Sequence, residues 1–132
     1  KQSLERITSL LQSGVDQGAK LLVDGRGLKV PGHENGFFIG ASLFDQVTPE
    51  MDIYKEEIFG PVVSIVNPQN MDELVELVNS RNYANAACIY TQSGSAARDF
   101  KYRVNPSMVG INIGVATHEL LPLRWTRKLN VW

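Results

Sequence analysis

The sequence has few residues of the types that build disulfide and metal sites. It contains one cysteine, Cys88, and two histidines, His33 and His118, among 132 residues. A single thiol excludes an internal disulfide framework and any metal site made of several cysteines. Neither histidine has a second ligand at metal-binding spacing, and we interpret both as surface residues. The sequence therefore predicts no metal site.

A charge excess of one sign and long apolar runs are also missing. The 13 basic and 14 acidic residues leave a formal charge of −1, which gives no bias toward nucleic acid or an anionic membrane. No apolar run approaches the roughly 20 residues that cross a bilayer, and the first residues resemble an amphipathic helix rather than a signal peptide. We expect small-molecule or protein partners, no nucleic acid or membrane, and a cytoplasmic location, or the mitochondrial matrix in a eukaryote.

The glycines do not form a phosphate-binding loop. The sequence contains neither the GxGxxG pattern between a strand and a helix nor the GxxxxGK[ST] pattern. A self-contained nucleotide site is therefore not predicted.

The first half of the sequence mixes one helix with short strands. Apolar residues at helical spacing predict a helix over residues 2–17, and a strand over 20–23 ends at an Asp-Gly turn. A glycine-rich loop over 25–36 follows. We expect two short strands, or one bent strand, over residues 37–44, and an exposed connection over 48–57.

The second half alternates regularly between strands and helices. The predicted elements are a strand over 61–66, a helix over 71–80, a strand over 86–91, a helix capped by Ser93 and ending near 103, and a strand over 108–113. Parallel strands need a crossover connection. The fold class is therefore predicted to be α/β, an open and mostly parallel sheet with flanking helices.

Cys88 is the only thiol that could serve as a nucleophile. It lies in the apolar segment AACIYT, without a histidine or a cation nearby in sequence to lower its pKa. We interpret it as a buried structural cysteine.

The segment KEEIFGPVV, residues 55–63, has two interpretations. In the ordinary one, Glu56 and Glu57 are solvated, Phe59 anchors the core, and Gly60 and Pro61 form a turn. In the functional one, a rigidly held carboxylate accepts hydrogen bonds from a ribose diol and the aromatic ring packs on a flat heterocycle. Spacing alone does not decide between them.

A family resemblance favours the functional interpretation. The segment resembles the EEIFGPV signature of the aldehyde dehydrogenase superfamily. The likeness to its CoA-acylating branch, the methylmalonate-semialdehyde dehydrogenases, extends through SGVDQGAKLLVDGRGLKVPGHENGFFIG, LFDQVTPEMDIYKEEIFGPVVSIV and VGINIGVA. It covers roughly residues 1–116 and implies the later part of the catalytic domain. Gly40-Ala41-Ser42 departs from the family's usual Gly-Pro-Thr.

The resemblance also implies the residue roles. Glu57 would accept hydrogen bonds from the nicotinamide ribose of NAD, and Phe59 would flank the nicotinamide. Gly60 and Pro61 would shape the turn that presents them, and the resemblance gives Glu56 no ligand contact.

The family's reaction converts methylmalonate or malonate semialdehyde, NAD and CoA to propionyl-CoA or acetyl-CoA, carbon dioxide and NADH. It uses a nucleophilic cysteine, an oxyanion-stabilising asparagine and an NAD-binding domain, all N-terminal to the matched region. We therefore expect no catalytic residue in this chain, Cys88 included, and no turnover by the isolated chain.

The sequence is also compatible with two other functions. The chain could be a non-catalytic scaffold or interaction module that self-associates, and we expect a homo-oligomer in either case. An independent small ligand-binding α/β domain fits less well, because the family match is long.

The family likeness stops after Ala116. Codons for Thr117 to Trp125, read one nucleotide later, can spell the family's Pro-Met-Ser-Phe-Phe-Pro-Phe-Gly-Gly. We hypothesise a frameshift here, so that residues 1–116 form a partial catalytic domain and residues 117–132 are an unselected, poorly ordered tail. Resequencing the locus tests this hypothesis.

Overall fold

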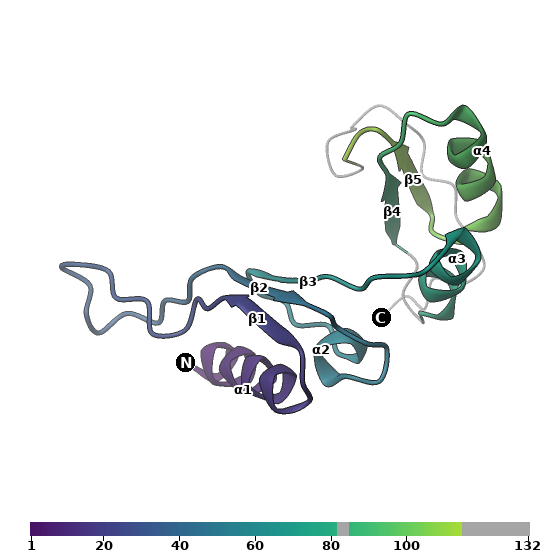
Figure 1. The fold of residues 1–132 in the computed structure, drawn as a ribbon. Helices are drawn as coiled ribbons and strands as arrows, with labels where there is room; N and C mark the ends of the chain where they lie inside the picture. The colour runs from purple at the N-terminus through teal and green to yellow at the C-terminus, as the bar shows by residue number, and fades with distance from the viewer. Residues whose placement is uncertain (82–84, 115–132) are drawn as a thin grey trace. The chain divides into compact units, whose positions relative to one another are not determined.

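The computed structural model describes residues 1–81 and 85–114. It divides the chain into two compact units, Lys1–Asn67 and Pro68–Trp132. Figure 1 shows their elements. The predicted tail and His118 lie outside the described residues.

The first unit is a three-stranded sheet with helices. Its elements are α1 (Gln2–Asp16), β1 (Lys20–Val23), β2 (Ser42–Asp45), α2 (Asp52–Lys55) and β3 (Val62–Ser64). The strand order is β1-β2-β3, with β1 antiparallel and β3 parallel to β2. The sheet is therefore mixed.

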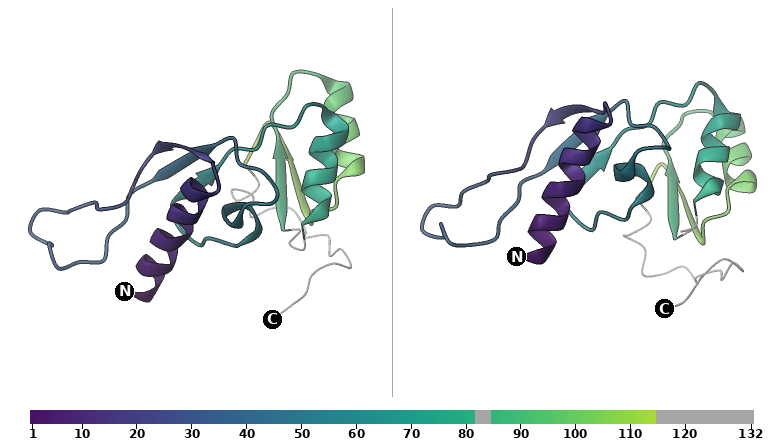
Figure 2. Two further views of the ribbon diagram at one scale, coloured as in Figure 1. Left: turned by 60° about the horizontal axis from the view of Figure 1, so that its bottom comes forward. Right: turned by 90° about the horizontal axis from the view of Figure 1, so that it is seen from below.

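The core of the first unit lies between α1 and one face of the sheet. Figure 2 shows α1 lying beside the sheet of β1 and β2. Leu11 of α1 and Phe44 of β2 are fully buried, and they anchor the core cluster. Gly14 lets α1 approach this cluster closely, because a Cβ there would lie 2.8 Å from Cδ1 of Ile53. Burial of this helix face removes apolar surface from water and stabilises the unit.

The opposite face of this sheet carries an apolar row without cover from described residues. Val23, Leu43 and Val63 are register partners across the three strands. Val23 is 51% exposed and Val63 is 59% exposed. Leu43 alternates with the core residue Phe44 along β2, so it points to the opposite face, and its partner Val63 lies beside it. Leu21 pairs with Phe44 on the core side, and a register shift between Leu21 and Val23 brings Val23 beside Leu43.

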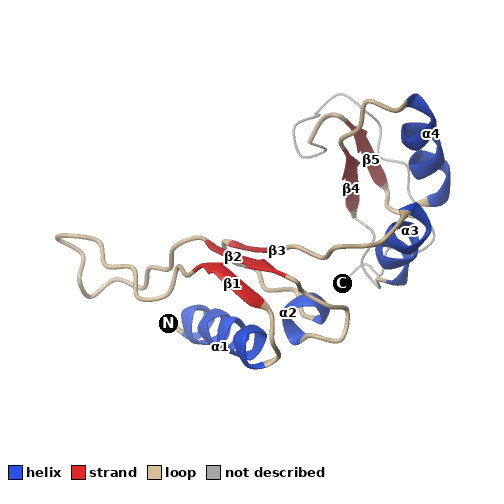
Figure 3. Ribbon diagram, in the orientation of Figure 1, coloured by secondary structure: helices blue, strands red, loops and turns tan. Residues whose placement is uncertain are grey.

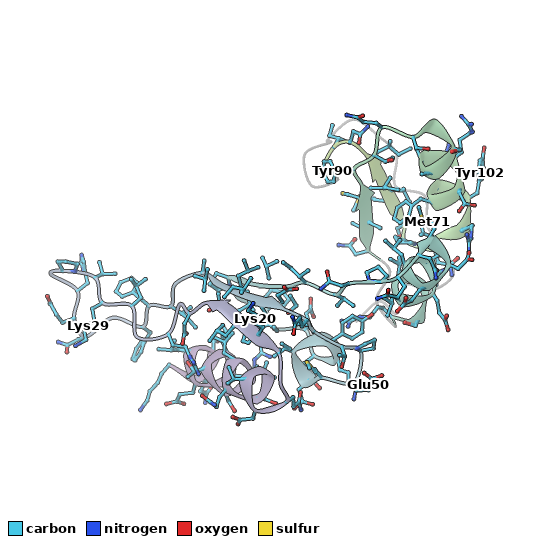
Figure 4. The ribbon with its side chains drawn as sticks, in the orientation of Figure 1. Lys20, Lys29, Glu50, Met71, Tyr90 and Tyr102 are labelled. Carbon is cyan, nitrogen blue, oxygen red and sulfur yellow. The ribbon has the colours of Figure 1, made fainter. Side chains whose placement is uncertain are left out.

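A long loop, residues 24–41, joins β1 to β2 and extends away from the sheet (Figure 3). Lys29 lies near its tip in Figure 4. The two ends of the loop meet at Gly25 and Gly40, where the Gly40 amide donates to the Gly25 carbonyl at 2.8 Å. A Cβ on Gly25 would clash with the Gly40 carbonyl, so this crossing of two backbones requires glycine.

The second unit is a parallel strand pair with helices. Its elements are α3 (Met71–Ser80), β4 (Ala86–Ile89), α4 (Gly94–Arg103) and β5 (Met108–Ile111). The parallel pair β4-β5 is joined through α4, as a crossover requires.

Side-chain caps begin both helices of the second unit. Asn70 accepts a hydrogen bond from the Glu73 amide at the start of α3, and Ser93 accepts one from the Ala96 amide at the start of α4. Val75, Phe100 and Val104 form the buried core under these helices. The predicted cap at Ser93 and the predicted bounds of α3 are confirmed.

The predicted α/β class is confirmed, with corrections to the sheet. Of the three strand pairings in the described residues, two are parallel. These strands form two sheets rather than one, and β3 pairs with β2 and not with β4 or β5. Residues 37–39 form no strand. The connection predicted as exposed over 48–57 contains α2, with Met51 and Ile53 buried.

Cys88 is exposed, so the prediction of a buried cysteine is wrong. Ala87 and Ile89 pack against the helical core, and alternation along β4 turns Cys88 to the other face. Apolar neighbours in sequence indicated burial, but no described residue covers that face of β4 enough to bury it.

Within the described part of the chain, no helix is long and apolar enough to cross a membrane.

Candidate functional site

The segment with the two glutamates links α2 to β3. The Glu56 amide donates to the Asp52 carbonyl at 2.8 Å, which closes the last turn of α2, and Glu56 itself is extended. At the other end, the Ser42 amide of β2 donates to the Pro61 carbonyl at 2.9 Å. Regular structure therefore holds both ends of the segment.

Phe59 faces solvent, and its backbone is left-handed. Its side chain is 82% exposed and its φ is +51°. This conformation is unfavourable for an L-residue with a bulky side chain. Ile58, not Phe59, packs against the core cluster of the first unit. The ordinary interpretation, in which Phe59 anchors the core, is therefore wrong.

Glu57 is exposed, and no hydrogen bond or ion pair of its carboxylate is recorded with any residue in the described ranges. Its oxygens are therefore available to accept hydrogen bonds from a ligand. Glu57 and Phe59 flank the inward-facing Ile58, so the acid and the ring project from the same short turn.

The segment rests on α1. Nη1 of Arg6 donates to the Glu57 carbonyl at 3.2 Å, and Nη2 donates to the Ile58 carbonyl. The next residue of α1, Ile7, fills the space beside Gly60, where a Cβ would lie 2.8 Å from Ile7 Cδ1. A helix 51 residues away in sequence thus shapes the turn.

Sequence reasoning did not find Arg6. A cation on an exposed helix position is usually solvated, and no short motif links residue 6 to residues 57 and 58. The available signal was the helical spacing of Ile7, which indicates a buried position. It therefore places Arg6, the residue before it, at the edge of the buried face of the helix.

The remaining candidate groups do not join this site. Glu56 is exposed, and no hydrogen bond or ion pair of its carboxylate is recorded with the described residues. His33 is also exposed, as predicted, and its ring meets Phe38 edge-on at 6.4 Å. Residues 1–81 and 85–114 contain no cluster of histidine, cysteine or acidic side chains able to hold a metal ion.

Comparison with known proteins gives a consistent answer. The model of the aldehyde dehydrogenase family matches residues 1–123. The chain is 55% identical over 108 residues to a malonate-semialdehyde dehydrogenase of Pseudomonas aeruginosa. It is 50% identical over 113 residues to an acylating, mitochondrial methylmalonate-semialdehyde dehydrogenase of Arabidopsis thaliana. These alignments cover 82% and 86% of this chain but 22% and 19% of the two relatives.

A solved structure shares the fold. A protein of Sinorhizobium meliloti, named as a candidate methylmalonate-semialdehyde dehydrogenase and crystallised with NAD, superposes with a TM-score of 0.85 at 53% identity. The superposition covers 93% of this chain and 24% of that one. The chain therefore spans about a quarter or less of the proteins it matches. On the extent of the family match, this chain belongs to the aldehyde dehydrogenase family.

Proposed function

We propose that this chain supplies the nicotinamide-ribose contact of an NAD-dependent, CoA-acylating methylmalonate- or malonate-semialdehyde dehydrogenase. In this proposal Glu57 accepts hydrogen bonds from the ribose hydroxyls and Phe59 packs beside the nicotinamide. The observation that carries it is the pairing of an unengaged carboxylate with an 82% exposed ring on one supported turn.

The residues fit this part of NAD chemically. A ribose diol offers two donors to a carboxylate, which only accepts. The ring of Phe59 offers an apolar surface to a flat heterocycle. An exposed phenylalanine in a strained backbone conformation is costly, and such strain is typically found at functional sites.

The whole enzyme would oxidise the semialdehyde and transfer the acyl group to CoA, with NAD accepting the hydride when bound. Names of the matched relatives support the substrate class and the acylating chemistry. This chain would contribute residues 1–116 of the catalytic domain. With the nucleophile expected N-terminal to the matched region, it would not turn over substrate alone. Cytoplasm, or the mitochondrial matrix in a eukaryote, remains the proposed location.

The first prediction tests Glu57 against its neighbour. The isolated chain is titrated with nicotinamide mononucleotide, and chemical-shift changes in the amides of residues 57–60 give the dissociation constant. We expect weak binding, because a single contact edge repays little of the entropy lost on association. Glu57→Gln should weaken it roughly tenfold, because it removes a charge-assisted hydrogen bond.

Glu56→Gln is the matched control, because it removes the same charge one residue away. It should leave the affinity unchanged. Equal losses in the two variants would mean that only general electrostatics attracts the ligand, and shifts confined to residues outside 56–61 would overturn the assignment.

Self-association is a second candidate function. The apolar row of Val23, Leu43 and Val63 lies on a sheet face that the described residues leave open, and Tyr90 is also 70% exposed. Apolar surface of this kind is typical of interaction sites. A chain that dimerises in sedimentation experiments and shows no nucleotide-induced shifts would favour this function over the first.

A further inference from the structure

We infer that Arg6 is a positioning residue for the nicotinamide-binding turn: its guanidinium holds the turn in the conformation that presents Glu57 and Phe59. The inference rests on the proposed function for its ligand, and on the contacts of α1 for its mechanism.

Residues 57–59 of the turn have little backbone hydrogen bonding of their own. Between residue 56 and residue 61, three backbone hydrogen bonds are recorded: the Glu56 amide donates to Asp52, the Gly60 carbonyl accepts from the Val62 amide, and the Pro61 carbonyl accepts from the Ser42 amide. No backbone amide is recorded as a donor to the carbonyls of Glu57 and Ile58. Arg6 donates to both.

A guanidinium is well suited to donate to two neighbouring carbonyls. Its planar fork presents parallel N–H donors, which can bridge two successive carbonyl oxygens. Among the described residues, no carboxylate lies within ion-pair distance of Arg6. The Arg6 side chain is therefore committed to the turn and not to a surface ion pair.

The hydrogen bonds from Arg6 hold the turn in a strained backbone conformation. Phe59 follows the two clamped carbonyls directly and has a φ of +51°. Gly60 follows it, and Ile7 occupies the space that a side chain at Gly60 would need. Arg6 and Ile7 thus hold the chain on both sides of Phe59, and a relaxed turn would rotate its ring and the Glu57 carboxylate away from their present directions.

The test separates conformation from binding. In the full chain, the strength of the intraresidue HN–Hα NOE of Phe59 reports its positive φ, and nicotinamide mononucleotide titration reports binding. Arg6→Gln should lose the strong NOE and weaken binding roughly tenfold, as expected for two lost hydrogen bonds. Arg6→Lys keeps the charge without the fork and should recover only part of both signals.

Glu5→Gln serves as the control on the same helix, because Glu5 is exposed and its recorded ion pair is with Lys1 at 3.9 Å. It should leave both signals unchanged. Circular dichroism of each variant verifies that α1 stays folded. A strong Phe59 NOE retained in Arg6→Gln would overturn the inference, and so would full recovery in Arg6→Lys.

The two proposals fail differently. If the NOE changes in Arg6→Gln but no variant binds nucleotide, Arg6 positions the turn and the proposed function is wrong. If Glu57→Gln weakens binding while Arg6→Gln changes neither signal, the proposed function holds and the role of Arg6 is wrong.

Discussion

At the scale of single residues, Phe59 combines two costs that folding alone would avoid. Its ring gains little from burial because the residue is 82% exposed, and its backbone occupies the left-handed region. Gln46 and Asn112 also have positive φ, but both carry polar side chains. Asn112 in addition bonds to both backbone groups of Thr91 through its side-chain amide. Phe59 has no such compensation, which favours a ligand as the reason for its position.

Phe59→Gly should therefore stabilise the fold and impair binding. Left-handed strain of about 1–2 kcal/mol is relieved, while the extra chain entropy of glycine costs roughly 0.5–1 kcal/mol, so the net gain is about 0–1.5 kcal/mol. Urea unfolding measures it. Phe59→Ala removes the same ring but keeps most of the strain, and it should show no gain. Equal stability of the two variants would contradict this account.

At the scale of elements, the helix caps explain why the second unit begins its helices where it does. Oδ1 of Asn70 accepts from the Glu73 amide at 2.9 Å, and Oε2 of Glu73 accepts from the Gln69 amide at 2.7 Å. The two side chains thus satisfy donors that the first turn leaves without partners.

Asn70→Ala should cost about 1 kcal/mol of stability in the second unit, since it removes the cap. Urea unfolding followed through amide signals of α3 measures the change. Asn70→Asp keeps the accepting oxygen and should restore most of the loss. A full loss in the aspartate variant would show that the asparagine side chain acts in some other way.

Elements with a local signal were predictable from the sequence, and those that depend on distant partners were not. The helix Met71–Ser80 and the Ser93 cap follow from spacing and capping within ten residues. The four-residue α2 is too short for helical periodicity to appear. The exposure of Cys88 depends on which side of β4 the helices cover, which the apolar sequence around it does not encode.

The candidate site divides in the same way. Glu57 and Phe59 were predicted because a motif resemblance names them, and their ligand roles remain predictions. Arg6 donates to carbonyls that lie 51 or more residues away in sequence. Every residue has a backbone carbonyl, so the acceptors do not depend on the side chains at positions 57 and 58. Such a contact leaves no pattern in a single sequence.

At the scale of the whole molecule, the helices of residues 1–81 and 85–114 cover one face of each sheet and leave the other face without a helix. In the first unit the bare face carries the row Val23, Leu43 and Val63, and in the second Cys88 lies opposite the helical core. The chain also spans about a quarter or less of its matched relatives. We therefore expect the isolated chain to self-associate through apolar sheet surface.

Val63→Lys should reduce that association, because it places a charge in the apolar row at a residue that is 59% exposed. Sedimentation velocity over a range of concentrations measures the effect. Leu28→Lys adds the same charge on the long loop, where Leu28 is 49% exposed, and should leave association unchanged. If both variants behave alike, net charge rather than the sheet face governs association.

The crossing of Gly25 and Gly40 has a consequence for chain length. Because these two residues close the base of the loop through a backbone hydrogen bond, the residues between them need not contribute to the sheet register of β1 and β2. Closure entropy grows only logarithmically, by roughly 0.6 kcal/mol for each doubling of a flexible loop. The tip around Lys29 is thus a place where foreign peptide can be inserted at little thermodynamic cost, whereas a side chain on Gly25 at its base would clash with the Gly40 carbonyl.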